Sequence, residues 1–409
     1  MIKKLKWLYP GMGVKRWIIL SASGVVLLII GSMMCVYREL SAFGLCFIFF
    51  GIIILILAVR RMMKTVINVF LPQQEKELVD LVYHQMQLRR GPKVVVIGGG
   101  TGLSVLLQGL KRYTSNITAI VTVADDGGSS GRLRTELDVL PPGDIRNCLV
   151  ALADKEKLMQ DLFQFRFPED TQLAGHNFGN LYITAMTKLT GDFEKAVKES
   201  SKVLAISGQV VPATLKRVSL VARYEDGSEV VGESQINKTD KRIQTVYLKP
   251  LDCEPTQDAL DAIAQAEAIV LGPGSLYSSV IPNLTIRKIQ AAILEAKAVR
   301  VYVCNVMTQD GETHGYTASD HVRAIVEHTD PKIIDYVIVN KASIAAEFLE
   351  KYRAENAYPV QADIVLIKKM GYMVIEDDVV STVDYVRHNS DKLALIVNNL
   401  LVELKYKGI

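Results

Sequence analysis

"KVVVIGGGTGLSVLLQGL", residues 93–110, is the stretch that decides the fold. Four short apolar residues run into glycines, then Thr-Gly, then a helical pattern. A glycine turn between a strand and a helix presents the first N–H groups of the helix to an anion. The turn is not the dinucleotide fingerprint, because Leu103 stands where the last glycine belongs, and no Gly-Lys-Ser/Thr of a Walker A loop follows. It predicts a phosphate-binding turn, and a tight turn without a ligand is the alternative.

Apolar runs typical of buried parallel strands recur along the rest of the chain. Helical patterns, such as 256–267 and 284–297, lie between several of them. The alternating residues of 203–250, with an Asp226-Gly227 turn, indicate an antiparallel insertion or edge. We therefore predict an open, mostly parallel α/β sheet with an antiparallel β insertion over residues 93–409. The apolar runs occupy 94–97, 117–124, 268–271, 299–304 and 336–339.

Two uncharged apolar segments precede this domain. They span residues 17–37 and 41–59, and each is close to the ~20 residues that a helix needs to cross a bilayer. A cleaved signal peptide is the alternative for the first segment, but a second apolar segment follows at once. We predict a two-helix transmembrane hairpin over residues 1–64 and an amphipathic linker over 65–92, in which Pro72 can begin a helix.

Charge is divided unevenly along the chain. Residues 1–64 carry nine Lys/Arg and one acid, and the remainder carries 38 basic and 43 acidic residues. Basic residues flank both ends of the hairpin, so we expect a two-pass protein of the cell membrane with both termini and the main domain cytoplasmic. The acidic remainder predicts no nucleic-acid partner. The five cysteines form no CxxC pair, so no zinc or redox motif is expected.

Polar clusters directly follow the apolar runs. Ligands of doubly wound folds bind outside the carboxyl ends of the strands, so we expect these loops to line one wide cleft. Two anion-type loops imply a ligand with several polar parts, such as a nucleoside diphosphate compound. The candidate residues of these loops are Gly99, Gly100, Thr101, Gly102, Asp125, Asp126, Ser129, Ser130, Arg132, Gly272, Gly274, Ser275, Tyr277, Asn305 and Thr308.

The loop after the second run offers two kinds of ligand group. Residues 127–131 are small and rich in N–H donors, which suits an anion nest. Arg132 or Arg134 would add a charge-assisted contact. Asp125 and Asp126 would bind ribose hydroxyls or hold Mg²⁺ beside a phosphate. A solvated loop without a ligand is the alternative.

Two helix starts add further candidates. Asp144 and Asn147 lie in "PPGDIRN", residues 141–147, where Asp144 is placed like an N-cap or a ligand group. His176, Asn177 and Asn180 lie in "HNFGN", residues 176–180. His176 is the best candidate for acid–base work, and a hydrogen-bonded structural histidine is the alternative.

Six motifs together resemble one family. They resemble the gluconeogenesis-factor family of the YvcK type, which is related to 2-phospho-L-lactate transferase, the CofD type. The resemblance implies a Rossmann-like α/β fold that binds UDP-sugars such as UDP-N-acetylglucosamine, and a role in cell shape and wall synthesis during gluconeogenic growth. The transferase branch implies transfer of a phospholactyl group with Mg²⁺. The motifs are "GGGTG" (98–102), "DDGGSSGRLR" (125–134), "PPGDIRN" (141–147), "HNFGN" (176–180), "LGPGSLYSSVIPNL" (271–284) and "NVMTQDGET" (305–313).

The resemblance also assigns roles to single residues. It implies that the glycine loops line the nucleotide phosphates, that Asp125 lies near the centre of the cleft, and that Tyr352 and Arg387 lie close to the nucleotide sugar. The chain departs from the family pattern T-Q-P-G-E-T-D-G at Asp310 and His314. It also adds the hairpin, which typical soluble members lack.

These features favour a binding protein over an enzyme, because no nucleophile–base pair stands at a recognisable spacing. We expect a membrane-anchored regulator that binds a UDP-sugar and needs no metal. Its other candidate partners are the membrane, a second copy of the chain and wall-synthesis proteins. A transferase acting on a nucleotide-activated phosphate ester, with Mg²⁺ as a candidate cofactor, is the alternative. A membrane scaffold with a vestigial cleft is a third hypothesis.

Overall fold

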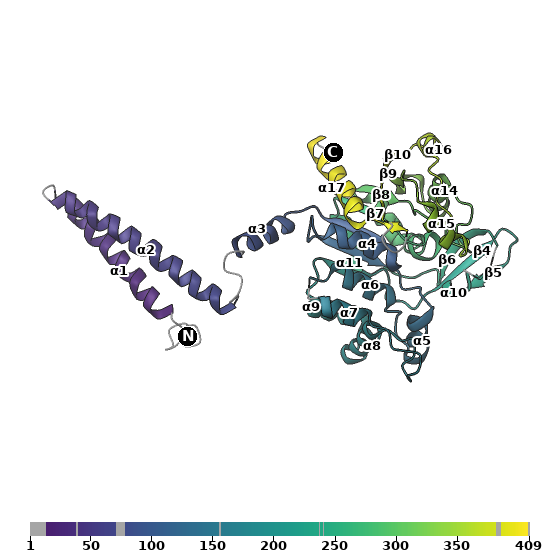
Figure 1. Ribbon diagram of the computed structural model, residues 1–409, viewed down its shortest axis with the longest axis horizontal. Helices are drawn as coiled ribbons and strands as arrows, with labels where there is room; N and C mark the ends of the chain where they lie inside the picture. The colour runs from purple at the N-terminus through teal and green to yellow at the C-terminus, as the bar shows by residue number, and fades with distance from the viewer. Residues whose placement is uncertain are drawn as a thin grey trace. The chain divides into compact units, whose positions relative to one another are not determined.

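The computed structural model of the chain describes residues 14–37, 40–70, 78–154, 157–236, 238–239, 241–381 and 386–407. The chain divides into two compact units, Met1–Met86 and Gln87–Ile409. The described part of the first unit is helical, and the second unit contains every strand that the structure describes (Figure 1).

The first unit is built on two antiparallel helices, α1 (Val14–Cys35) and α2 (Ser41–Phe70), which lie side by side in Figure 1. They approach closely because glycines of one helix face glycines of the other. A Cβ atom on Gly31 would lie only 2.7 Å from the Gly44 carbonyl oxygen, and a second glycine pair repeats this contact. Small residues at such positions let helix backbones pack against each other in a membrane.

Both helices contain a segment long and apolar enough to cross a membrane, Arg16–Cys35 and Ser41–Lys64. Helix α2 continues to Phe70, beyond the uncharged apolar segment that ends at residue 59. Charge ends the apolar segment there, but lysine and arginine are good helix formers and do not end the helix. A third helix, α3 (Leu78–Arg89), follows, and Pro72 lies outside the described residues.

The second unit is organised around a seven-stranded sheet with the order β10-β9-β8-β7-β1-β2-β3. Every neighbouring pair in this sheet is parallel. The predicted Rossmann-like α/β fold is therefore confirmed. The strands span Val94–Gly98 (β1), Ile117–Val121 (β2), Gln209–Pro212 (β3), Ala268–Leu271 (β7), Val299–Val303 (β8), Tyr336–Asn340 (β9) and Met373–Asp377 (β10).

The winding of the chain reverses at β1, which pairs with β2 on one side and with β7 on the other. From β2 the chain moves outward to β3, and from β7 it moves in the opposite direction through β8, β9 and β10. The loops that follow the two strands at such a reversal diverge. They leave a crevice at the carboxyl ends of the strands. Here these loops are residues 98–102 and 272–275.

Helices cover both faces of the sheet. Right-handed crossovers that advance in opposite directions place their helices on opposite faces. Accordingly, α4 packs against α6 and α17, whereas α13 packs against α11. The helices span Gly100–Leu110 (α4), Gly128–Leu137 (α5), Gly143–Leu152 (α6), Lys157–Gln164 (α7), Phe178–Thr190 (α8), Phe193–Leu204 (α9), Gln257–Gln265 (α11), Ile281–Leu284 (α12), Arg287–Glu295 (α13), Ala318–His328 (α14), Ala346–Arg353 (α15), Ile364–Lys369 (α16) and Ser390–Lys407 (α17). Two single turns, η3 (Leu276–Val280) and η4 (Pro331–Ile333), complete them.

A separate antiparallel sheet with the order β5-β4-β6 is inserted between β3 and α11. It contains β4 (Ser219–Tyr224), β5 (Glu229–Val231) and β6 (Ile243–Lys249), and the short helix α10 (Glu233–Ile236) follows β5. The predicted turn joins β4 to β5, with the Gly227 amide donating to the Tyr224 carbonyl.

Two edge strands of the main sheet were missed by the sequence analysis. Strand β3 lies in the range assigned to the insertion, but it pairs with β2 in parallel. It has only two fully apolar residues in a row, and β10 is half exposed, so neither makes a continuous apolar run. A small separate sheet lies next to Arg387: β11 (Val380–Ser381) pairs with β12 (Arg387–His388), and residues 382–385 lie outside the described part.

Candidate functional site

The N-terminus of α4 opens at the crevice. Its N-cap, Gly99, provides no capping side chain, and Gly100 adopts a φ of 66°, which favours glycine. The Gly100 amide is instead hydrogen-bonded to the carboxylate of Asp144. The amides of Thr101 and Gly102 belong to the first turn, whose N–H groups have no partner within a helix. This turn can therefore donate hydrogen bonds to an anion.

The loops after β1, β7 and β8 meet at this point. A Cβ on Gly102 would lie 2.8 Å from the Pro273 carbonyl oxygen and 3.0 Å from the Gly274 Cα, so only glycine allows this approach. The side chain of Asn305 bridges to the same loop: its Nδ2 donates to the Gly274 carbonyl over 2.8 Å, and its Oδ1 accepts from the Gly274 amide over 3.3 Å. The expected gathering of these loops is present.

A pocket of about 160 Å³ opens between these loops and the small sheet β11–β12. It brings the first turn of α4 into one cavity with Arg387, although 285 residues separate Gly102 from Arg387 in the chain. It is lined by Thr101, Gly102, Val105, Asn305, Val306, Met307, Val386, Arg387 and His388.

Two side chains fix the strand that carries Arg387. The hydroxyl of Tyr352 accepts from the Val386 amide over 2.9 Å, so Tyr352 holds the residue before Arg387. His388 lies 3.1 Å through Nε2 from the Cys304 carbonyl oxygen, and burial lowers the pKa of His388 to about 4. A neutral ring therefore donates this bond near pH 7. Tyr352 thus positions the site through the backbone, with its hydroxyl engaged there.

The other side of the crevice is acidic. Burial raises the pKa of Asp144 to about 7, and the charge of Asp125 adds to this shift. Burial also raises the pKa of Asp125, whose Oδ1 accepts from the Gly127 amide over 2.8 Å. Asp144 is not an N-cap, because the N-cap of α6 is Pro142 and Asp144 lies in the first turn. Its side chain reaches back to the glycine loop of α4 instead.

Asp126 has a different position from Asp125. Its Oδ1 accepts from the Ser234 amide of α10 over 2.8 Å. This bond ties the inserted antiparallel sheet to the end of β2. It also brings Glu233 towards the cleft, where burial, followed by the charges of Asp125 and Asp144, raises the pKa of Glu233 to about 9. Glu233 carries no signal in the sequence, because its place depends on the insertion folding back.

A protein carboxylate reaches the loop after β7. Glu312, which is 4% exposed, accepts through Oε2 from the Tyr277 amide over 3.1 Å. Burial raises the pKa of Glu312. The Tyr277 amide, in a loop predicted to bind an anion, therefore donates to a carboxylate of the protein itself. Glu312 lies within the motif at residues 305–313, and this motif is the sequence feature that could have identified Glu312 as part of the site.

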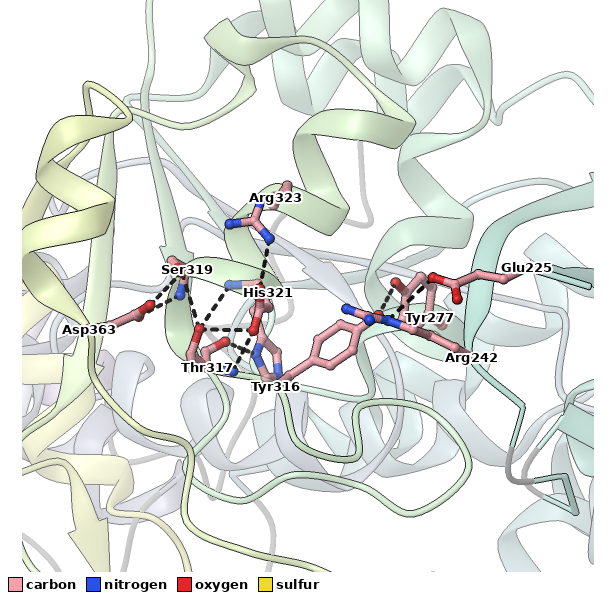
Figure 2. Close-up of polar contacts among 10 residues, drawn as sticks. Glu225, Arg242, Tyr277, Tyr316, Thr317, Ser319, His321, Arg323 and Asp363 are labelled. Atoms are coloured by element: carbon pink, nitrogen blue, oxygen red, sulfur yellow. Dashed lines mark hydrogen bonds and ion pairs between the residues drawn. The ribbon is translucent and has the colours of Figure 1, made fainter.

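Tyr277 and Thr308 have their side chains engaged within the protein. Tyr277 is buried, and its hydroxyl lies 2.9 Å from that of Tyr316, beside Arg242 in the polar network of Figure 2. The Thr308 hydroxyl accepts from the Tyr358 amide over 2.9 Å. Both residues therefore support the loops around the cleft.

The motif at residues 176–180 forms a buried hydrogen-bond cluster with α5. The Ser129 hydroxyl lies 3.1 Å from His176 Nδ1, and it accepts from the Asn177 amide and from Asn180 Nδ2. His176 is 7% exposed, and burial lowers its pKa. Asn177 also caps α8. His176 is therefore hydrogen-bonded within the protein, as the alternative hypothesis states. It lies beside the loop that follows β2.

The remaining candidates lie around this cluster. Arg132 donates to the Ala174 carbonyl over 2.6 Å, and Asn147 Oδ1 accepts from Arg146 over 2.6 Å. Ser130 is buried next to Gly143, and Ser275 begins the turn η3. Within the described residues, no three His, Cys, Asp or Glu side chains are grouped so as to hold a metal ion. Asp125 and Asp144 are the carboxylates that a Mg²⁺ ion beside a phosphate would draw on.

Comparison with known proteins identifies the family. The family model of 2-phospho-L-lactate transferase CofD matches residues 94–380. The chain belongs to the CofD family. Within it, the chain is 51% identical to the gluconeogenesis factor of Bacillus subtilis, over 76% of this chain and 99% of that protein. A UPF0052-family protein of Bacillus halodurans, solved by crystallography, superposes with a TM-score of 0.73 at 50% identity, over 75% of this chain and 99% of that one.

Other gluconeogenesis-factor relatives also include the N-terminal region. A relative from Nostoc sp. is 46% identical over 96% of this chain and 91% of its own length, and one from Clostridium acetobutylicum is 41% identical over 99% and 93%. The Bacillus relatives match 76% and 75% of this chain. The likeness to some CofD-family members thus includes the hairpin.

Proposed function

We propose that this CofD-family protein is a membrane-anchored, cytoplasmic regulator that binds a UDP-sugar of the UDP-N-acetylglucosamine type and supports cell shape and wall synthesis during gluconeogenic growth. The pocket that joins the first turn of α4 to Arg387 is the observation that carries the proposal. Relatives of this chain at 51% identity are named gluconeogenesis factors.

The geometry suits a diphosphate that continues into sugar hydroxyls. Backbone N–H groups of the α4 turn and the guanidinium of Arg387 supply donors for phosphate oxygens. Asp125 and Asp144, on the other side of the glycine loop, supply acceptors for hydroxyl groups. Because one pocket of about 160 Å³ holds only part of a nucleotide sugar, the ligand extends from it along the crevice.

A transferase of the 2-phospho-L-lactate type is the second candidate function, and the match of residues 94–380 to the CofD model favours it. Mass spectrometry of nucleotides retained by the purified chain separates the two functions. UDP-N-acetylglucosamine supports the regulator, whereas a guanosine diphosphate or a deazaflavin supports the transferase. An empty protein that also fails to bind added UDP-sugar contradicts both.

Arg387→Ala tests the binding site. We expect it to weaken UDP-sugar affinity by about 1.5–3 kcal/mol, the usual scale for a hydrogen bond to a charged group, or roughly tenfold to over a hundredfold. Titration calorimetry on residues 87–409, which form a compact unit of their own, measures this. Arg112→Ala is the matched control, because Arg112 follows the far end of α4 and pairs with Asp391. Unchanged affinity in Arg387→Ala removes that residue from the site. A large loss of ligand-free thermal stability makes it structural.

Chelation tests the role of metal. We expect UDP-sugar binding to survive EDTA, because backbone N–H groups and Arg387 supply the donors for the phosphates. Titration with and without EDTA is the measurement, with added Mg²⁺ as the control. Binding that disappears with EDTA and returns with Mg²⁺ would assign Asp125 and Asp144 as metal ligands and favour the transferase.

A further inference from the structure

Two arginines from different helices of the hairpin share one aromatic ring. The Arg16 guanidinium carbon lies 5.0 Å from the centre of the Trp17 ring, and that of Arg61 lies 5.7 Å from the same centre. Each position allows a cation–π attraction to the indole.

The indole offers a third donor at the same place. Trp17 Nε1 is buried and has no hydrogen-bond partner within the described chain. An indole N–H can only donate, so its partner must be an acceptor. Two guanidinium groups and one indole N–H together suit a group with several acceptor oxygens and negative charge, and a phosphate has these properties.

The place of this cluster in the hairpin indicates the source of the phosphate. The two apolar segments run over Arg16–Cys35 and Ser41–Lys64, so Arg16 and Arg61 stand at the same end of both segments. Arginine and tryptophan at the end of a membrane span lie at the depth of the lipid headgroups. Basic pockets between transmembrane helices on the cytoplasmic side bind anionic headgroups. Residues 14–37 and 40–70 contain no Asp or Glu.

We propose that Arg16, Trp17 and Arg61 form a binding site for the phosphate of an anionic phospholipid headgroup. This inference rests on the proposed membrane insertion of the hairpin and is independent of the UDP-sugar. The site holds one headgroup between α1 and α2 at the cytoplasmic surface, and the lipid enters from the side of the hairpin.

The composition of the chain provides a local probe. The sequence has two tryptophans, Trp7 and Trp17, so Trp7→Phe leaves Trp17 as the single indole. The full chain is placed in phosphatidylcholine vesicles that contain equal small fractions of either brominated phosphatidylglycerol or brominated phosphatidylcholine. We expect stronger quenching by the brominated phosphatidylglycerol. Arg16→Gln with Arg61→Gln should remove this preference, so that the two brominated lipids quench Trp17 equally.

A matched control separates a built site from general surface charge. Arg60→Gln with Lys64→Gln removes two other positive charges from the same end of α2 and leaves Arg16, Trp17 and Arg61 in place. The site predicts that this variant keeps most of the preference. The inference is overturned if both variants lose the preference for phosphatidylglycerol equally. It is also overturned if the Trp7→Phe chain with all its arginines shows no such preference. Inorganic phosphate at millimolar concentration should not abolish the preference, and if it does, the site takes free phosphate instead.

Alkaline carbonate extraction of the same vesicles makes the outcomes distinguishable. A chain that washes off the vesicles contradicts the membrane insertion itself. A chain that stays inserted but shows no lipid preference contradicts the headgroup site alone and leaves the hairpin as a membrane anchor.

Discussion

At the scale of single residues, the glycine loop at the start of α4 is hydrogen-bonded to a carboxylate from another helix, α6. Asp144 accepts from the Gly100 amide and is close to Asp125, and its pKa is raised to about 7 by burial. Asp144 therefore titrates near neutral pH. Since the neighbouring α4 turn is the proposed phosphate site, the charge of Asp144 affects both stability and binding.

Asp144→Asn tests the effect on stability. The native pKa lies above the unfolded value of about 3.9, so the native state binds more protons between about pH 4 and pH 7. The free energy of unfolding should therefore fall as pH rises through this window, by up to about 4 kcal/mol from this group. Denaturant unfolding of residues 87–409 at several pH values should show a flatter profile in Asp144→Asn. A profile as steep as that of the unaltered protein contradicts the raised pKa.

At the scale of elements, two devices hold helices and sheets in place. In the hairpin, glycines let α1 and α2 approach until Gly31 and Gly44 almost touch. In the second unit, the inserted sheet is tied to the end of β2 by Asp126, which accepts from the Ser234 amide, and by Arg134, which donates to the Val218 carbonyl. Both contacts hold the insertion against the segment that follows β2.

Gly31→Leu tests the hairpin. A side chain there would collide with the Gly44 carbonyl oxygen, because even a Cβ would lie 2.7 Å from it. The helices should separate by a few ångströms at the level of Gly31. Double electron–electron resonance between spin labels at the open end of the hairpin measures this separation. Val26→Leu is the control, because Val26 is 51% exposed on the same helix. A label distance unchanged in Gly31→Leu would show that the glycine contact does not hold the pair together.

At the scale of the whole molecule, charge is separated between the hairpin and the rest of the chain. Residues 1–64 carry nine of the 47 Lys/Arg and one of the 44 acids. The basic residues lie at both ends of the hairpin, so the positive-inside rule supports the proposal that both ends of the hairpin, and with them the second unit, are cytoplasmic.

Cysteine labelling tests this orientation. A cysteine introduced after Lys64, in a chain without Cys35 and Cys46, should resist a membrane-impermeant maleimide applied to intact cells. The same site should react after the cells are opened, and a cysteine placed at the tip of the hairpin is the control for labelling from outside. Efficient labelling after Lys64 in intact cells would reverse the proposed topology.

The sequence by itself determined the parallel sheet, the glycine loops and the two apolar segments. Each of these is a local pattern: a buried strand is a continuous apolar run, and a phosphate-type turn is a run of small residues at its end. Other elements depend on less local information, so the edge strands β3 and β10 were missed. Strand β10 is half exposed and need not be apolar, whereas β3 is buried but has only two apolar residues in a row before Pro212.

Only the tertiary structure decided which side chains share the cleft. Asp144 reaches the loop after β1 because α4 and α6 pack together, and Arg387 enters the same pocket as Thr101 because β12 lies over that loop. Glu233 faces the acidic groups only because the insertion folds back onto Asp126. Such contacts join residues more than 40 positions apart, and no local pattern of polarity encodes them. The sequence therefore determines which loops carry polar groups, and packing determines which of those groups meet.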